Sequence, residues 1–165
     1  MIVMILEADF LKELVAGPVE KRAITNLHVL NEAYDYARPS SFSRGMRIDL
    51  NGLTILLISG TASIDESGQS VHIGDFPGQM RRTFYNITAL LEAEGATWKD
   101  VVRTTCYLRD IERDYTAFNE ERTNFYREQG LDPLPASTGI QAILCRPELL
   151  IEIEAIAMFR TEPRA

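Results

Sequence analysis

The chain has 165 residues, 45% of them hydrophobic and 25% charged. A single domain of this length can bury about two-thirds of its unfolded surface, so no second domain is needed. The net charge of −7 and the pI near 4.9 repel polyphosphates on average, which makes nucleic acid a poor partner.

Residues 1–40 are interpreted as an N-terminal extension of a domain that spans residues 41–165. Asp9 is a candidate cap for a short helix over residues 10–16, which Gly17-Pro18 would end. The apolar residues that open the chain are too few for a membrane span and lack a basic leader, so we expect neither a signal peptide nor a membrane anchor.

The main sheet is predicted to begin with a β-hairpin. Residues 47–50 and 53–59 read as strands on either side of Asn51-Gly52. Asn-Gly between two strands is the strongest short hairpin signal, because both residues accept the positive φ angles of a tight turn.

Two helices and a strand follow. Asp75 is a candidate cap for the first helix and Gly95 its end, because apolar residues recur there at helical spacing: Phe76, Met80, Phe84, Ile87 and Leu91. Residues 101–109 alternate as a strand that places four residues on one face: Val102, Thr104, Cys106 and Leu108. A second helix is predicted near residues 115–129, with Gly130 as its stop.

Two more strands, interpreted as a final hairpin, complete the pattern. The first would place Ser137, Gln141 and Cys145 on one surface. The second gives an apolar face made of Ile151, Ile153, Ala155 and Ala157, while Glu152 and Glu154 share the opposite face with Leu150, Ile156 and Met158. The period of two therefore predicts a strand with carboxylates on a half-buried face.

This order of elements predicts an α+β fold, in which a mixed β-sheet carries both helices on one face. The other face would combine polar and apolar residues, and it is too polar for the core of a monomer. Packing three such sheets around an axis would bury the apolar members and leave clefts at the seams. We therefore predict a homotrimer with clefts between its subunits.

The cysteines and glycines restrict the expected chemistry. Cys106 and Cys145 are too few for a disulfide framework, and each falls in a predicted strand, so we expect a cytoplasmic protein. No histidine or cysteine pair has zinc spacing, and no glycine-rich turn has a phosphate-binding pattern. We expect no metal and no cofactor.

Three segments taken together resemble one known family. They are residues 59–65 (SGTASID), 75–94 and 134–158 (LPASTGIQAILCRPELLIEIEAIAM). From about Phe42 to Phe159 the chain is similar to the RidA/YjgF superfamily, also called L-PSP endoribonuclease-like proteins. The resemblance implies a chorismate-mutase-like fold and a barrel-like trimer with ligand clefts between subunits. The charge balance gives no support to the ribonuclease activity in the family's name.

The resemblance also implies site residues. Glu152 matches the carboxylate that positions the attacking water in the family's imine deaminases, and partial burial could raise its pKa; the alternative is an ion pair with another subunit. Ser137 stands where those enzymes carry the strand arginine that binds the substrate carboxylate. Phe42 stands where many carry a tyrosine, and Asn119 matches a residue often found near the cleft. Gln141 would share the strand face of Ser137.

Arg146 and Cys145 offer further chemistry. Arg146 lies in a predicted turn and could supply the missing guanidinium from another direction, or be a solvated turn residue. Residues 144–152, with 60–63 and 70–75, also resemble the C-terminal half of chorismatases, where a cysteine and a glutamate at this spacing belong to the active site. That resemblance implies that Cys145 and Glu152 act together. The alternative for Cys145 is an inert strand residue.

These patterns favour an enzyme that acts on a small carboxylic acid by hydrolysis, deamination or proton transfer. An enamine, an imine or a chorismate-like compound would be the substrate. Because Ser137 replaces the arginine, standard 2-imino acid deaminase activity is less expected. The alternative is a noncatalytic trimer that binds small molecules, and a chaperone role finds no identifiable residue.

Overall fold

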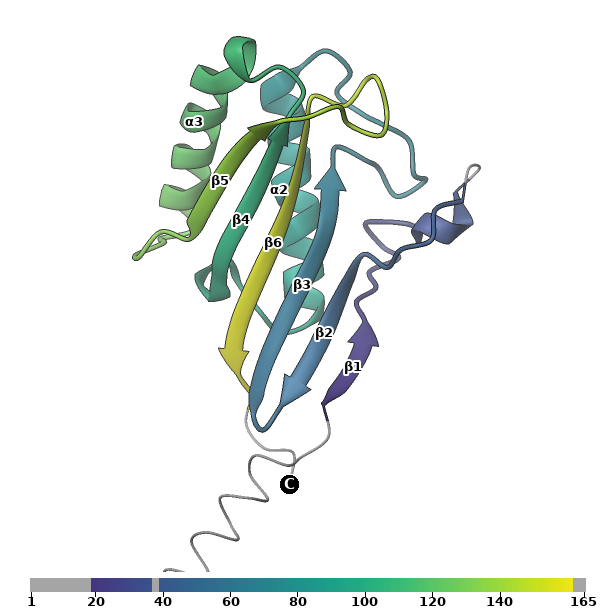
Figure 1. Cartoon of the computed structure of the whole chain (residues 1–165), viewed down its shortest axis with the longest axis vertical. Helices are drawn as coiled ribbons and strands as arrows, with labels where there is room; N and C mark the ends of the chain where they lie inside the picture. Colours follow the sequence, from purple (N-terminus) through teal and green to yellow (C-terminus); the bar gives the residue numbers. More distant parts are fainter. Residues whose placement is uncertain (1–18, 37–38, 162–165) are drawn as a thin grey trace, which may run out of the picture.

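The computed structural model describes residues 19–36 and 39–161, and it has an α+β fold with two long helices against one six-stranded sheet (Figure 1). The strands are β1 (Glu20–Ala23), β2 (Gly45–Leu50), β3 (Leu53–Ala62), β4 (Val101–Leu108), β5 (Ala136–Gln141) and β6 (Ile151–Arg160). The helices are α2 (Phe76–Ala93) and α3 (Ile111–Glu128), with short 3-10 turns η1 (Ala33–Asp35) and η2 (Trp98–Asp100). The predicted fold class is confirmed, whereas the helix predicted over residues 10–16 lies outside the described residues.

The strand order β1-β2-β3-β6-β4-β5 corrects the predicted final hairpin. β4 lies between β5 and β6, so the last two strands are not neighbours. The crossover through α3 returns the chain beside β4 in the same direction, which makes β4–β5 the one parallel pair of this sheet. β6 then enters the sheet between β3 and β4, antiparallel to both.

The Asn51-Gly52 hairpin is confirmed. Asn51 and Gly52 have φ angles of 48° and 75°, the positive values that a two-residue turn between twisted strands requires. β1, which belongs to the predicted extension, pairs with β2 from Glu20 opposite Asp49 to Ala23 opposite Met46. A boundary at residue 40 would therefore separate β1 from the sheet that it joins.

Both helices begin at aspartate caps. The Asp75 carboxylate accepts a hydrogen bond from the Gly78 amide at 3.0 Å, as predicted for the start of α2. Asp110 caps α3 in the same way, so this helix begins at Ile111 instead of near residue 115. Its first turn is largely charged, so apolar periodicity gives no signal for this part of the helix. Neither helix, nor any other in the described ranges, has the length and apolarity to cross a membrane.

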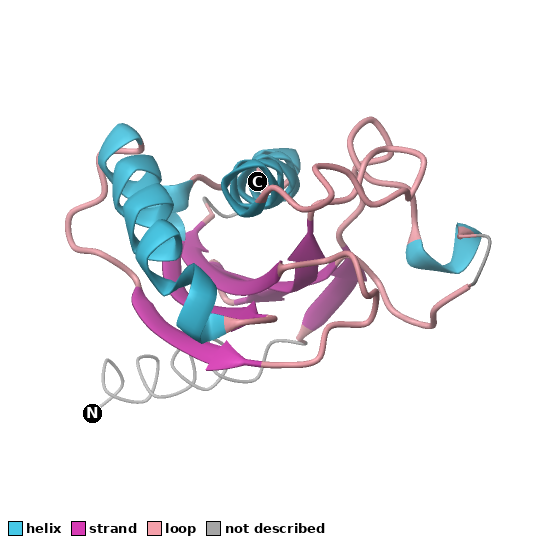
Figure 2. Ribbon diagram, turned by 90° about the horizontal axis from the view of Figure 1, so that it is seen from above, coloured by secondary structure: helices cyan, strands magenta, loops and turns pink. Residues whose placement is uncertain are grey.

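Both long helices cover one face of the sheet, as Figure 2 shows from above, and the core lies between them and that face. The predicted inner face of β6 is confirmed, because Ile151, Ile153, Ala155 and Ala157 are all buried. Phe84 of α2 stacks on Phe125 of α3 with ring centroids 4.2 Å apart, and Trp98 packs edge-on against both rings. This aromatic cluster fixes the two helices against each other.

A bulge changes one predicted face. Thr104, Cys106 and Leu108 of β4 point into the core as expected. Val102 does not, because the register with β6 shifts between Val101 and Arg103, and Val102 is 43% exposed. An extra residue at a bulge reverses the alternation of side chains beyond it.

The sheet face turned away from the helices, called the open face below, keeps apolar residues in contact with solvent. Leu57, Ile140 and Met158 are each about 40% exposed there (40%, 43% and 38%). Glu152 and Glu154 lie on the same face, since residues two apart in a strand point the same way. This combination matches the sequence prediction for β6.

Candidate functional site

A cavity of about 690 Å³ lies at one end of the open face. Its walls come from the end of β3, the start of β6, the loop after β5 and parts of residues 30–44 and 67–69. Four of the predicted site residues line it: Phe42, Cys145, Arg146 and Glu152. The cavity therefore joins segments that are far apart in the sequence.

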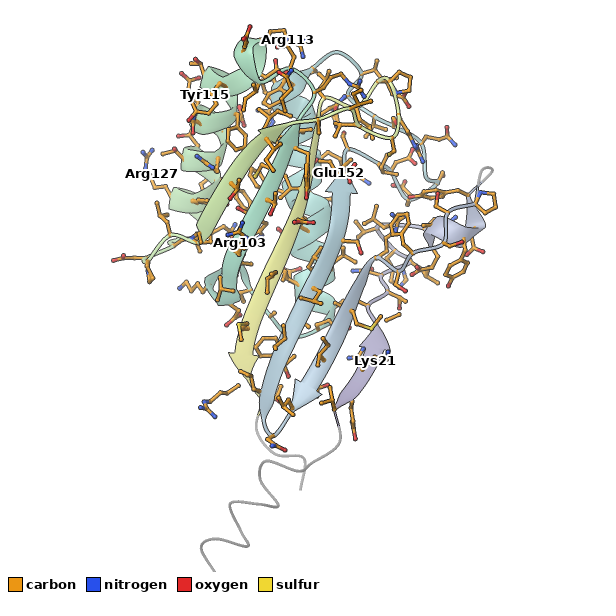
Figure 3. All side chains as sticks on the ribbon, viewed as in Figure 1. Lys21, Arg103, Arg113, Tyr115, Arg127 and Glu152 are labelled. Carbon is orange, nitrogen blue, oxygen red and sulfur yellow. The ribbon has the colours of Figure 1, made fainter. Side chains whose placement is uncertain are left out.

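Glu152 is the ionisable group on the sheet side of this cavity, near the start of β6 and beside the tip of β3 (Figure 3). Its carboxylate accepts no hydrogen bond from the described residues. Burial raises the pKa of the Glu152 carboxyl, and the negative charge of Glu154 raises it further. A carboxyl group in this state can exchange a proton closer to neutral pH than an ordinary glutamate.

Gly60 of β3 makes room for the Glu152 carboxylate. A Cβ atom at residue 60 would overlap the Glu152 carboxyl group, so any larger residue would displace it. The structure also shows that β3 and β6 shift register between Ile58 and Thr61, next to this contact. A register irregularity beside a functional group is a common way to aim a side chain.

Another part of the cavity lining combines aromatic rings and guanidinium groups. Arg44 is buried, donates from Nε to the Asn31 carbonyl at 2.9 Å, and contacts the Tyr36 hydroxyl. Its guanidinium carbon lies 4.9 Å from the centroid of the Tyr36 ring and 5.6 Å from that of Phe42. These cation-π contacts place a guanidinium group and two aromatic rings in the lining of the cavity that also contains Glu152.

Arg146 adds a second guanidinium to the same wall. Its Nη1 donates to the Gly68 carbonyl at 2.8 Å and to Ser70 Oγ at 3.2 Å, and the group lies 5.2 Å from the Tyr36 ring centroid. Because these oxygen acceptors are uncharged, its positive charge is not neutralised by them. Arg146 therefore lines the cavity as a charged residue whose position is fixed by hydrogen bonds to uncharged groups.

Cys145 lies in the loop after β5 and not in a strand, which corrects the prediction. β5 ends at Gln141, and the turn at residues 146–149 closes with a hydrogen bond from the Leu149 amide to the Arg146 carbonyl. Cys145 is exposed beside the cavity. Although the residue is exposed overall, partial burial of its sulfur raises the pKa of the thiol, the Glu152 charge adds to this, and Arg146 opposes it. This environment disfavours the thiolate.

The loop that carries Cys145 and Arg146 is tied down from two directions. Arg109 donates to the carbonyls of Leu149 at 2.5 Å and Arg146 at 2.6 Å. Gln79 of α2 donates to the Glu148 carbonyl at 2.9 Å, and its side-chain oxygen accepts from the Leu150 amide at 2.8 Å. Both side chains satisfy backbone groups that the turn leaves without partners, and so they define this wall of the cavity.

Ser137 and Gln141 do not share a surface with Glu152 and Cys145, contrary to the sequence prediction. Ser137 lies opposite Thr104 of β4, whose side chain points to the helix side of the sheet. Gln141 accepts a hydrogen bond from the Ile111 amide at the start of α3. The prediction failed because it assumed that β5 and β6 pair directly, whereas β4 separates them.

Asn119 of α3 lies with Ser137 in a second polar cluster. Arg122 donates to Asn119 Oδ1 at 2.7 Å and to Ser137 Oγ at 3.1 Å. No sequence pattern marked Arg122 as a site residue. The other residues that sequence reasoning missed are Arg44, which had no local signal, and Gly60, whose signal was its place in the SGTASID segment.

The model of the family described as Endoribonuclease L-PSP matches residues 37–159. The chain belongs to this family, the RidA/YjgF superfamily. The match covers β2 to β5, β6 as far as Phe159, and both long helices. The RidA/YjgF resemblance found in the sequence is therefore confirmed.

Named members of the RidA/YjgF superfamily are similar to this chain. A RutC family protein of Pyrococcus horikoshii is 35% identical over 102 residues, which are 62% of this chain and 77% of the relative. The 3-aminoacrylate deaminase RutC of Acinetobacter baylyi is 34% identical over 103 residues, 62% of this chain and 78% of the relative. The crystal structure of the YjgF gene product of E. coli has a TM-score of 0.66 and 26% identity, and covers 84% of this chain and 99% of that one.

Proposed function

We propose that this RidA/YjgF member hydrolyses a small enamine or imine carboxylic acid, with Glu152 as the group that transfers the proton. The observation that carries the proposal is the Glu152 carboxyl group, which has a raised pKa, no hydrogen-bond donor among the described residues and an opening into a cavity of about 690 Å³. The similarity to a 3-aminoacrylate deaminase supports an enamine substrate.

The proposed reaction consumes one water and releases one ammonia. Protonated Glu152 gives its proton to the enamine carbon that does not bear the nitrogen, which leaves an iminium group on the neighbouring carbon. Water adds to that carbon while the Glu152 carboxylate accepts a proton from it. The hydroxyl proton of this adduct then passes to the amine, the C–N bond breaks as the C=O bond forms, and ammonia leaves behind an oxo acid.

We propose that this reaction takes place at the interfaces of a homotrimer. The partly exposed apolar residues of the open face support self-association, because a face that mixes Leu57, Ile140 and Met158 with polar groups suits an interface. Light scattering at micromolar protein should give three times the mass of the chain. A monomeric mass would remove the interface from the proposal.

Two features favour a second candidate, a trimer that binds such acids without converting them. Phe42 carries no hydroxyl on the cavity wall, and Ser137 carries no charge. A chorismate-like substrate is a further variant of the leading proposal, supported by Cys145 and Glu152 lining one cavity. The net charge of −7 disfavours RNA as a ligand, because a polyanion is repelled on average, whereas a small anion can bind next to a local arginine.

A substrate panel tests these candidates. The panel contains 2-imino acids, 3-aminoacrylate, a 2-aminomuconate-like enamine and chorismate, and ammonia or product release is followed for each. Glu152→Gln should lower the turnover of an accepted substrate by about 100-fold or more, while Glu128→Gln, at the exposed end of α3, serves as the control. No turnover, combined with a rise in melting temperature on adding a member of the panel, would support the binding protein instead.

A further inference from the structure

The Arg122 guanidinium interacts with uncharged groups among the described residues. It donates to Ser137 Oγ at 3.1 Å and to Asn119 Oδ1 at 2.7 Å, and its guanidinium carbon lies 4.4 Å from the Phe118 ring centroid. Across residues 19–36 and 39–161, no carboxylate lies within 4.0 Å of it. Since a guanidinium carries five N–H donors, several remain for a ligand.

Ser137 can donate to the same ligand. Its Oγ accepts hydrogen bonds from Thr104 Oγ1 at 3.0 Å and from Arg122 at 3.1 Å. With both bonds accepted, the hydroxyl proton of Ser137 remains available for donation. Arg122 and Ser137 therefore offer adjacent charged and neutral donors on two rigid elements, the arrangement that a carboxylate accepts.

We infer that Arg122, assisted by Ser137, is the carboxylate anchor for the substrate class proposed above. The inference rests on the proposed function for the identity of the acid, but not for the anion site itself. One guanidinium in a chain of net charge −7 favours a small monoanion over a polyanion. A serine on β5 thus works with an arginine on α3, because Arg122 extends across to the strand position.

Arg122 and Glu152 cannot reach one small molecule within a single chain. On β4, Thr104 pairs with Ser137 of β5 and Tyr107 pairs with Glu152 of β6. Thr104 and Tyr107 are three residues apart in this strand, so their side chains have opposite parity. Side chains of opposite parity point to opposite faces of a sheet. The Arg122 anchor of one copy must therefore serve the Glu152 cavity of another, and β5, as an exposed edge strand, allows that approach.

Binding of an unreactive oxo acid tests the anchor without any turnover. Calorimetry with 2-oxobutanoate should give a dissociation constant about 10-fold to 100-fold weaker for Arg122→Ala, and a smaller loss for Ser137→Ala. Arg122→Lys should restore part of the affinity, which separates loss of charge from loss of folding. Arg127→Ala, on the side of α3 away from the sheet (Figure 3), is the matched control. Wild-type affinity in Arg122→Ala, or wild-type protein that binds no oxo acid, would overturn the anchor.

Crosslinking tests the contribution of a second copy. Cys145 lines the Glu152 cavity and is exposed, so a short bismaleimide should join Cys145 of one copy to the new thiol of Arg122→Cys in another. The product is a covalent oligomer on a denaturing gel, and Cys145→Ser should abolish it. Equal crosslinking of Arg127→Cys and Arg122→Cys would reject the arrangement. A folded protein that binds oxo acid through Arg122 but turns nothing over would reject only the proposed function.

Discussion

The Glu152 carboxyl group of β6 fills the space that Gly60 of β3 leaves free, because a Cβ atom at residue 60 would fall on that carboxyl group. The atom that would have to move is the end of a flexible side chain, so the backbone can stay in place. A methyl group at residue 60 would therefore redirect Glu152 at little cost to the fold.

We accordingly predict that Gly60→Ala changes the site more than the stability. The displaced carboxyl group should regain water, so its pKa should fall toward the ordinary value for glutamate, and any turnover that depends on Glu152 should fall with it. NMR titration of the Glu152 carboxyl carbon measures the pKa, and thermal unfolding measures the stability. The control is Gly139→Ala, where the added Cβ meets no atom within 4 Å. An unchanged Glu152 titration in Gly60→Ala would contradict the prediction.

The raised pKa of Glu152 predicts how stability depends on pH. Above the ordinary pKa of glutamate near 4.5, the unfolded chain loses this proton while the folded protein keeps it. The folded state is therefore destabilised as pH rises from that value through the raised folded-state pKa. Glu152→Gln should be more stable than the wild type at pH 7, and the difference should vanish below pH of about 4.

Urea unfolding at fixed protein concentration measures this difference, with the fluorescence of Trp98, the single tryptophan of the chain, as the signal. Glu128→Gln controls for the loss of one negative charge at an exposed position. Equal stability of wild type and Glu152→Gln at pH 7 would show that the carboxyl group is not penalised by burial.

Glu94 should be a stability residue with no part in the site. Its side chain, 3% exposed, accepts hydrogen bonds from Arg22 at 2.5 Å and from Arg47 at 3.2 Å, and so ties β1 and β2 to the end of α2. Glu94→Ala would leave the buried Arg47 with a single carboxylate partner, Asp49. We expect a loss of about 3 kcal/mol in the free energy of unfolding. Glu92→Ala, an exposed neighbour in the same helix, should cost under about 0.5 kcal/mol, and equal losses would contradict the role.

Arg109 should control the order of the loop that forms one wall of the cavity. Arg109→Ala removes charged donors from the Leu149 and Arg146 carbonyls, and we expect a loss of about 2–3 kcal/mol. Hydrogen exchange should speed up in residues 142–150 while β3 keeps its protection, and a maleimide should label Cys145 faster. Arg127→Ala, an exposed arginine of α3 outside this loop, is the control. If Cys145 is labelled at the wild-type rate in Arg109→Ala, the loop keeps its conformation without the Arg109 hydrogen bonds, and the prediction is wrong.

The parts of the fold with local signals could be predicted from the sequence. Asn51-Gly52 specified its hairpin because its two residues accept positive φ angles, and Asp75 marked the start of α2 because its carboxylate can accept from the first turn. The alternation in β6 identified its buried face, and so placed Glu152 on the opposite one. The start of α3 was missed because Asp110 is followed by charged residues, where apolar periodicity gives no signal.

The sequence by itself determined the α+β class, the helices and the half-buried position of Glu152, since each depends on residues within a few positions of one another. Only the tertiary structure decided that β6 enters between β3 and β4, which moves Ser137 away from Glu152 and toward Arg122. It alone brought Arg44 and Arg146 to one cavity wall. Strand order and cavity walls depend on contacts between distant segments, and those contacts follow from how the whole core packs, which no local pattern encodes.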